Sequence, residues 1–149
     1  MTDTRTTERE EVLTKARKAK EVAPVLAQLS TAKKNEILLT AADVLVEKTD
    51  EILAANQKDI DEGRADGMAE SLVDRLSLDA DRIAGIAGGL RQVAGLKDPV
   101  GEVLGGGVMP NGIQMRQIRV PLGVMGMVYE ARPNVTVDAF GLALKSGNV

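Results

Sequence analysis

The residues best suited to chemistry lie together in one short stretch, Tyr129-Glu-Ala-Arg-Pro-Asn134, which contains a phenol, a carboxylate, a guanidinium and a carboxamide. A carboxamide N–H can stabilise a developing oxyanion, so Asn134 is our candidate catalytic residue. A guanidinium binds phosphate or carboxylate through two parallel hydrogen bonds, so Arg132 is our candidate for substrate binding. The same types also have structural uses, because Asn stabilises turns beside Pro and Arg often pairs with nearby carboxylates such as Glu130 or Asp138.

The residues on either side of this loop predict a strand that leads into a helix. Val124–Tyr129 is apolar at nearly every position, which is typical of parallel strands buried on both faces. The segment Val135–Lys145 has helical spacing, and Gly147-Asn148 would end it as a helix C-cap, with Lys145 solvated or capping the helix end. Open α/β sheets bind ligands at the carboxyl ends of their strands. We therefore predict that the loop is a candidate site between a strand and a helix.

Helices are predicted over most of the chain before Gly95. Thr7-Glu-Arg-Glu10 reads as a capping box, so a helix should begin near Glu8, and Pro24 should kink or split it. The second helix should begin at Ser30 or Thr31, and the third at Thr49 or Asp50. The residues expected on inward faces of these three helices are Val12, Ala16, Ala19, Ala23, Leu26, Ile37, Leu38, Ala41, Leu45, Ile52, Leu53, Asn56 and Ile60.

Turns and glycines divide the rest of this helical part. Asp61-Glu-Gly63 and Asp66-Gly67 predict a loop, and Ala69–Arg75 a short helix after it. Asp79 should cap a longer helix that reaches Gly95, with Ile83, Ile86, Leu90 and Val93 inward. This helix contains Gly85, Gly88 and Gly89. We interpret these glycines as points of close helix packing, and contact with a ligand is the alternative.

A β-hairpin is predicted after the joint at Asp98-Pro99. Glu102–Met109 and Ile113–Val120 flank Pro110-Asn-Gly112, and Asn-Gly is the dipeptide that favours a two-residue type I′ turn. Gly105-Gly-Gly107 lacks the Lys-Ser/Thr of a phosphate-binding loop, so it predicts a bulge or a flexible bend.

Composition excludes several classes of function. A net charge of −3 and 1% aromatic residues do not fit a nucleic-acid-binding surface. The sequence has no Cys and no His, so it predicts no disulfide and no zinc or iron–sulfur site; only oxygen ligands remain for a metal, and we assign no metal ligands. Met1–Glu11 lacks the apolar core of a signal peptide, and no apolar run approaches the roughly 20 residues of a membrane span. We expect a cytoplasmic protein with neither nucleic-acid nor membrane partners.

Three segments resemble one enzyme family: Pro121–Asn148; Ser71–Leu76 with Arg82-Ile-Ala84 and Asp98–Val103; and Glu51–Asp59. They resemble the gamma-glutamyl phosphate reductases, or glutamate-5-semialdehyde dehydrogenases, of the aldehyde dehydrogenase superfamily. Family members are longer, so the chain looks like their N-terminal part. The resemblance implies an α/β fold with a helical part (1–98), a β-hairpin arm (99–120) and the incomplete start of a dinucleotide-binding domain with the first strand and helix of a parallel sheet (121–149).

The resemblance also implies an activity. Family members use NADPH to reduce L-glutamate 5-phosphate to L-glutamate 5-semialdehyde and phosphate in proline biosynthesis, through attack by a cysteine thiolate. This chain has no cysteine, so we expect it to be inactive alone. The resemblance assigns Asn134 to the oxyanion, Tyr129 and Glu130 to the cofactor, and the hairpin to association of identical subunits. The alternative from a different class is a non-enzymatic assembly module of helices plus hairpin.

Overall fold

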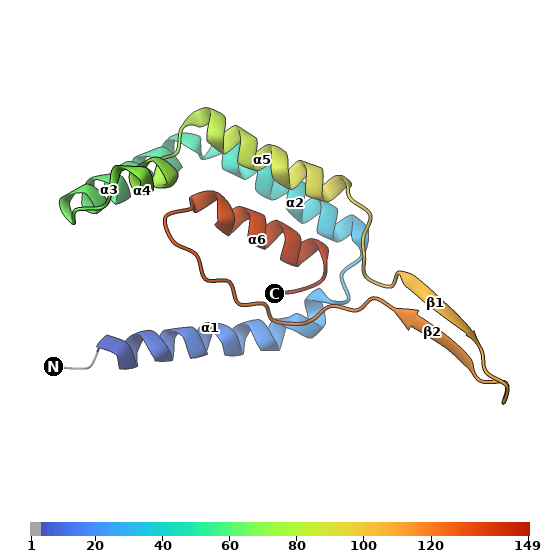
Figure 1. The fold of residues 1–149 in the computed structure, drawn as a ribbon. Coiled ribbons are helices and arrows are strands. Elements are labelled where there is room, and N and C mark those ends of the chain that lie inside the picture. The colour runs from blue at the N-terminus through green and yellow to red at the C-terminus, as the bar shows by residue number, and fades with distance from the viewer. Residues whose placement is uncertain (1–3) are drawn as a thin grey trace. The chain divides into compact units, whose positions relative to one another are not determined.

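The computed structural model describes residues 4–149, which form six helices and two strands (Figure 1). The chain forms two compact units. The first comprises the chain up to Thr31, Lys97–Gly126 and Ala143–Val149, and the second comprises Ala32–Leu96 and Met127–Leu142. The elements are α1 (Thr4–Leu26), α2 (Thr31–Glu47), α3 (Thr49–Ala65), α4 (Glu70–Leu76), α5 (Ala80–Gly95), β1 (Val103–Val108), β2 (Gln114–Ile118) and α6 (Pro133–Lys145). None of the described helices is long and apolar enough to cross a membrane.

The second unit contains most of the buried apolar side chains. In it α5 runs alongside α2, where Arg91 pairs with Asp43 at 2.8 Å, and α4 lies against α3 (Figure 1). The predicted starts of α2 and α3, the short α4 and the Asp79 cap of α5 are confirmed. The core residues of this unit are Leu38, Ala42, Ile60, Val73, Ile83, Ala87, Leu90 and Ala94. The amphipathic spacing of α2, α3 and α5 therefore predicts the buried faces well.

A glycine allows α6 to pack closely within this unit. A Cβ atom at Gly141 would lie 2.7 Å from Cδ2 of Leu90 and 3.8 Å from Cδ2 of Leu38. The first distance is shorter than any ordinary van der Waals contact, so a side chain here would displace the methyl group of Leu90. Gly141 thus marks the contact of α6 with α5 and α2.

The prediction of a loop at Asp61–Gly63 is wrong, because α3 continues through these residues to Ala65. Gly63 is buried in the helix, and the Met68 side chain covers it at 3.0 Å from where a Cβ atom would stand. The helix ends with two bonds typical of a Schellman motif, from the Met68 N–H to the Gly63 carbonyl and from the Gly67 N–H to the Arg64 carbonyl. Gly67, at φ 81°, supplies the turn that the Asp66-Gly67 dipeptide predicts.

The interpretation of the α5 glycines as packing points is also wrong. At Gly85, Gly88 and Gly89 no described atom outside the neighbouring backbone of α5 lies within 4 Å of where a Cβ atom would stand. Close packing in this unit uses Gly141 of α6 instead, which meets α5 at the side chain of Leu90. The glycine cluster therefore leaves open space along α5.

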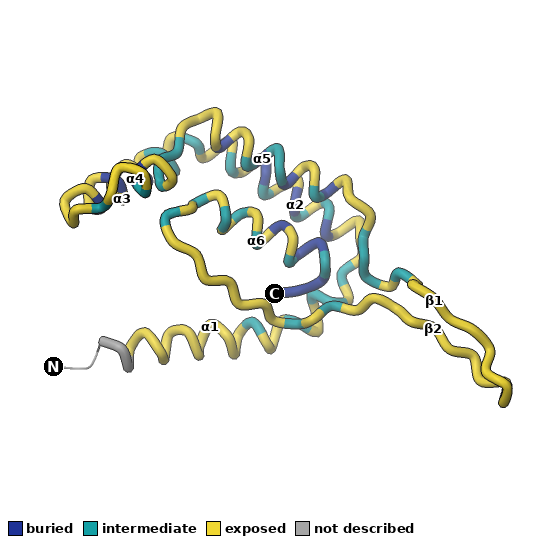
Figure 2. Tube along the Cα trace, in the orientation of Figure 1, coloured by how far each residue is buried: buried dark blue, intermediate teal, exposed yellow. Residues whose placement is uncertain are grey.

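Helix α1 departs from its prediction at both ends. It begins at Thr4, so Thr7 lies inside the helix rather than at its cap. It is not split at Pro24 and extends two residues further, to Leu26; the lost hydrogen bond falls in the last turn, where little helix remains to be disrupted. The predicted apolar face is half-buried only in this last part, and Val12 and Ala16 are exposed (Figure 2).

The predicted hairpin is confirmed, with a different turn. β1 and β2 pair antiparallel, and a bulge at Leu104 precedes Gly105, so the glycine run lies in the strand rather than in a bend. The Gly112 N–H donates to the Met109 carbonyl, Gly112 has φ 83°, and Asn111 does not have a positive φ. This is a three-residue loop rather than a type I′ turn, because Pro110 fixes its own φ near −65°, as the first central residue of a type I turn requires.

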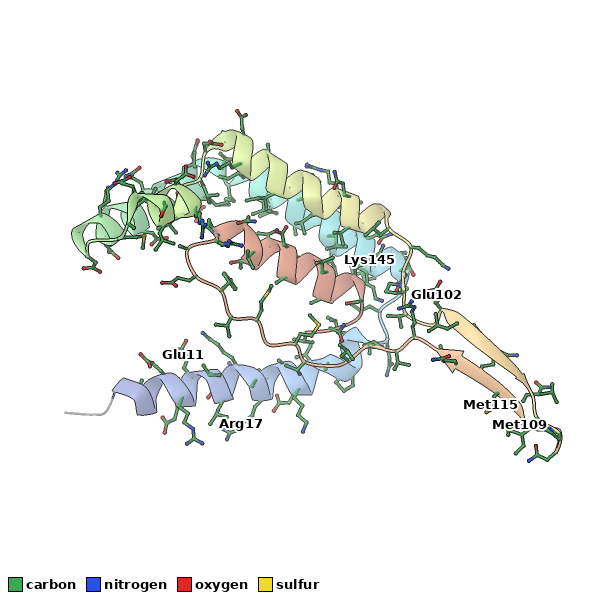
Figure 3. All side chains as sticks on the ribbon, viewed as in Figure 1. Glu11, Arg17, Glu102, Met109, Met115 and Lys145 are labelled. Carbon is green, nitrogen blue, oxygen red and sulfur yellow. The ribbon has the colours of Figure 1, made fainter. Side chains whose placement is uncertain are left out.

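Charged residues hold the base of the hairpin (Figure 3). Lys97 donates to the Glu102 carboxylate at 2.9 Å, and Arg119 pairs with the same carboxylate at 3.0 Å. The hydrogen bond and the charge of Lys97, assisted by Arg119, lower the pKa of Glu102. Asp98 accepts hydrogen bonds from the Val100 N–H and the Thr31 hydroxyl, which fixes the predicted joint before the hairpin.

Val124–Tyr129 is not a strand in this structure, and its side chains are exposed (Figure 2). The Met125 N–H donates to the Val149 carbonyl, and the Val149 N–H donates to the Gly123 carbonyl. These two bonds have the pattern of a parallel bridge. A ladder of one bridge does not make a strand, because the other backbone groups of the segment have no strand beside them among the described residues.

Helix α6 begins at Pro133, two residues before its predicted start, because proline at the first helical position lacks only an N–H that would be unpaired there. The predicted C-cap is confirmed: the Asn148 N–H donates to the Ala143 carbonyl and the Gly147 N–H to the Leu144 carbonyl. Gly147 has φ 75°, and a Cβ atom there would lie 2.8 Å from Cγ of Pro121.

Two polar residues at this end of α6 are buried. The Asn148 side-chain oxygen accepts from the Gly123 N–H at 2.8 Å, and its amide donates to the Ser146 hydroxyl at 2.9 Å. Lys145 is 3% exposed, so the prediction of a solvated lysine is wrong; it interacts within the fold instead. The sequence alone did not indicate that this turn is packed.

We expect Gly147→Ala to lower the free energy of unfolding by about 1–3 kcal/mol, because alanine is strained at positive φ and its Cβ would meet the rigid ring of Pro121. Gly88→Ala is the matched control: it lies in α5 with open space around it and should stabilise the chain by about 1 kcal/mol. Urea unfolding of the three proteins measures both. Equal stability of the Gly147 variant and the unsubstituted chain would contradict the capping geometry.

Candidate functional site

A cleft of about 430 Å³ lies within the second unit, beside the first turns of α6. The α4–α5 connection, the first half of α5 and the start of α6 contribute its walls. Its lining residues are Arg75, Ser77, Leu78, Arg82, Gly85, Ile86, Pro133, Asn134 and Asp138. The cleft therefore brings the predicted catalytic candidate, Asn134, together with polar residues that are about 50 positions away in the sequence.

Buried Asn56 of α3 fixes the wall formed by the α4–α5 connection. Its side-chain amide donates to the Leu76 carbonyl at 2.9 Å, and its side-chain oxygen accepts from the Leu78 N–H at 2.8 Å. Both ends of the carboxamide are thus used on a segment without regular secondary structure. The sequence places Asn56 on the inward face of its helix, and a polar residue at such a position was the signal for this role.

Arg82 of α5 holds the same wall from the other side. Its guanidinium donates to the Asp74 carbonyl at 2.8 Å and to the Ser77 carbonyl at 2.6 Å, and it pairs with the carboxylates of Asp74 and Asp79. Asp79 in turn accepts from the Arg82 N–H at 2.7 Å as the cap of α5. The charge of Arg82 is therefore balanced by structural partners, although the residue lines the cleft.

Asn134 lies at the second position of α6 and lines the cleft. Its amide donates to Oδ2 of Asp138, one turn further along, at 3.3 Å. A carboxamide has two N–H donors, and no other described residue accepts from Asn134. The bond to Asp138 orients the amide and leaves one N–H for a bound molecule, so a structural and a functional role are compatible.

The structure places the other predicted site residues outside this cleft lining. Arg132, Tyr129 and Glu130 are exposed on the segment before α6, and the Tyr129 hydroxyl hydrogen-bonds the Thr136 hydroxyl. Ala131 among them has φ 48°, a left-handed conformation that costs energy for a residue other than glycine. This residue turns the extended segment into the helix that carries Asn134.

Arg75 is a cleft residue that reasoning from the sequence missed. It is exposed at the end of α4 and makes no hydrogen bond or ion pair with any described residue. The available signal was its position in Ser71–Leu76, one of the segments that carry the family resemblance. The cleft thus offers an uncommitted cation at Arg75, a carboxylate at Asp138 and an N–H donor at Asn134, which suits a small polar molecule.

No protein-family model matches the chain. Among solved structures it is similar to gamma-glutamyl phosphate reductase from Thermotoga maritima, with a TM-score of 0.89 and 46% sequence identity over 93% of this chain. It is also similar to gamma-glutamyl phosphate reductase from Saccharomyces cerevisiae, with a TM-score of 0.85 and 31% identity over 90% of this chain. The chain covers 34% of each of those proteins, about a third of their length.

These similarities confirm the resemblance that the sequence motifs indicate. They also confirm the fold class, because the helices and the antiparallel hairpin match the N-terminal part of the gamma-glutamyl phosphate reductase fold. The roles of individual residues in the cleft follow from its geometry and chemistry instead.

We expect Asn56→Ala to lower the free energy of unfolding by about 1–3 kcal/mol, because the half-buried carbonyl of Leu76 at the end of α4 and the half-buried N–H of Leu78 in the connection lose their partner. Gln57→Ala is the control on the next residue, which is exposed and bonds only to Asp61; its effect should stay within about 0.5 kcal/mol. Urea unfolding gives both values. If the two variants are equally stable, Asn56 does not hold the wall of the cleft.

Proposed function

We propose that this chain forms the N-terminal part of an oxidoreductase that reduces L-glutamate 5-phosphate to L-glutamate 5-semialdehyde and phosphate in proline biosynthesis. The similarity to two gamma-glutamyl phosphate reductases over nearly the whole chain carries this proposal. The cleft beside α6 adds chemical support, since it combines a cation, a carboxylate and a free amide N–H around a space that admits a small molecule.

The proposed reaction assigns a catalytic role to Asn134. A cysteine thiolate attacks the acyl phosphate, a thioester forms as phosphate leaves, and hydride then reduces the thioester to the aldehyde. This chain has no cysteine, so the thiolate comes from another part of the enzyme. The N–H of Asn134 that Asp138 does not occupy stabilises the oxyanion of the tetrahedral intermediate. Arg132, two residues before it, binds the phosphate group.

The proposed cofactor is NADPH, which supplies the hydride. Tyr129 and Glu130 are our candidates for contact with it, and both are exposed. Neither lines the cleft, and the Tyr129 hydroxyl is already hydrogen-bonded to Thr136. Tyr129 and Glu130 therefore lie outside the cleft, and the remaining contacts of the cofactor come from other parts of the complete enzyme.

The hairpin supports a proposal of association between identical subunits. A cytoplasmic location is a separate part of the proposal. Every residue of both strands is exposed, including Val103, Leu104, Met115 and Ile118. Met109 and Met115 lie near its tip (Figure 3). A two-stranded hairpin is marginally stable alone, so apolar side chains on both faces favour a partner surface. The division into a helical part, an arm and a dinucleotide-binding domain remains a prediction for the complete enzyme.

The second candidate function, a non-enzymatic assembly module, also draws on these exposed hairpin residues. The two proposals differ in what they require of the cleft. A module needs neither Arg75 nor Asn134 for its role, whereas a reductase needs the cleft for its substrate.

We expect the complete enzyme that carries this chain to oxidise NADPH in the presence of freshly prepared glutamyl 5-phosphate, and the 149-residue chain alone to show no turnover. The chain lacks the thiolate that forms the thioester. Absorbance at the NADPH band follows both reactions. Turnover by the chain alone would overturn the cysteine mechanism, and silence of the complete enzyme would favour the assembly module.

In the complete enzyme, Asn134→Ala should lower kcat by on the order of 10²–10³ with little change in KM, because an oxyanion donor acts in the transition state. Asn134→Asp is a second variant of similar size that lacks the donors and adds a negative charge beside Asp138, so it should lose at least as much. Arg132→Ala should raise KM first, for glutamyl phosphate and for phosphate in the reverse direction. Wild-type kinetics in all three variants would leave both residues with structural roles only.

A further inference from the structure

We propose that Arg75 and Asp138 recognise the amino-acid end of the substrate, Arg75 by binding its α-carboxylate and Asp138 by binding its α-ammonium group. This inference rests on the proposed function, since it concerns how an amino-acid substrate is held in the same cleft. It assigns specificity to two residues that the sequence did not single out for substrate binding.

The charges of the cleft support this assignment. Of the two guanidinium groups on its wall, that of Arg82 is held by two backbone carbonyls and two carboxylates. That of Arg75 has no partner among the described residues. Asp138 accepts one long hydrogen bond, from Asn134, and is not within ion-pair distance of either arginine. One cation and one anion therefore face the cleft without neutralising each other, which is the complement of a zwitterion.

The spacing along α6 fits the length of the substrate. The amide nitrogen of Asn134 and Oδ2 of Asp138 lie 3.3 Å apart, so a molecule that hydrogen-bonds to both groups at about 3 Å can have its two contacting atoms up to about 9 Å apart. With the acyl oxygen at the remaining N–H of Asn134, the short carbon chain of glutamate is therefore long enough for its ammonium group to reach the carboxylate of Asp138. The reacting end and the charged end thus have separate contacts on one helix.

The opposite wall leaves room for this arrangement. Gly85 of α5 lines the cleft, and no described atom outside the neighbouring backbone of α5 lies within 4 Å of where its Cβ atom would stand. A glycine that is not needed for helix packing, in a helix where it costs stability, keeps the space between Arg75 and α6 open. Contact with a ligand, which is the alternative interpretation of this glycine from the sequence, is consistent with its position in the cleft.

Three aldehydes test the proposal in the reverse reaction of the complete enzyme, with phosphate and NADP present. L-Glutamate 5-semialdehyde has both charged groups, 5-oxopentanoate lacks the ammonium group, and 4-aminobutanal lacks the carboxylate. We expect Asp138→Asn to lower kcat/KM for the semialdehyde by roughly 10- to 100-fold more than kcat/KM for 5-oxopentanoate, which loses only the share that comes from the orientation of Asn134. We expect Arg75→Gln to lower kcat/KM for the semialdehyde by a similar factor relative to kcat/KM for 4-aminobutanal, which has no carboxylate for Arg75 to bind.

The measured quantity is the ratio of kcat/KM between two substrates on one preparation, so a partly folded variant does not disturb it. Asp81→Asn, an exposed carboxylate in α5 outside the cleft lining, is the control and should keep the wild-type ratios. Equal losses on both substrates would show that Asp138 only orients Asn134, and would overturn the inference. Unchanged ratios would overturn it too. Absence of turnover by the unsubstituted enzyme would overturn the proposed function itself.

Discussion

The close contact between Gly141 and Leu90 determines where the functional face of α6 lies. Asn134, Asp138 and Gly141 are separated by four and three residues, so they share one face of the helix. Because Gly141 has no side chain, that face can approach α5 and α2 closely enough for Leu90 and Leu38 to pack on it. The helix face that carries the amide and the carboxylate of the cleft is therefore positioned by an apolar contact one to two turns away, and the bond between the two side chains orients the amide on that face.

The other wall depends on polar side chains that act on the backbone. The carbonyls at the end of α4, of Asp74 and Leu76, and that of Ser77 in the connection to α5 accept from Asn56 or Arg82. Buried or half-buried carbonyls need such partners, since each unpaired group costs free energy. The same bonds fix the backbone on both sides of Arg75, because the carbonyls of Asp74 and Leu76 accept from Arg82 and Asn56. The side chain of Arg75 itself has no partner among the described residues.

The sequence predicts the features that one local pattern decides, and it fails where a second residue overrides that pattern. The inward faces of α2, α3 and α5, the Asp79 cap and the Gly147 C-cap follow from spacing and from residue type, and the structure confirms them. The Asp-Glu-Gly63 pattern predicts a turn because glycine favours turns, but Met68 covers Gly63 within the helix. Asn-Gly predicts a two-residue hairpin turn, but Pro110 fixes a different geometry. For the cleft, chemistry and position indicate Asn134, and the inward position of a polar residue indicates Asn56, whereas Arg75 requires the fold.

The segment Val124–Tyr129 shows that an apolar run predicts a strand only on the condition that another strand pairs with it. A strand exists only with a neighbour, because its backbone groups pair with another strand and not within the segment. Here one such neighbour begins to form: Val149 exchanges two hydrogen bonds with Gly123 and Met125 in the parallel pattern, after the chain has passed through α6. A strand, a crossover helix and a parallel return are the parts of a βαβ unit. The loop Glu130–Asn134 would then follow the carboxyl end of the first strand, which is where open α/β sheets bind ligands. The apolar run and the candidate site thus depend on the same condition, a parallel partner along Val124–Tyr129.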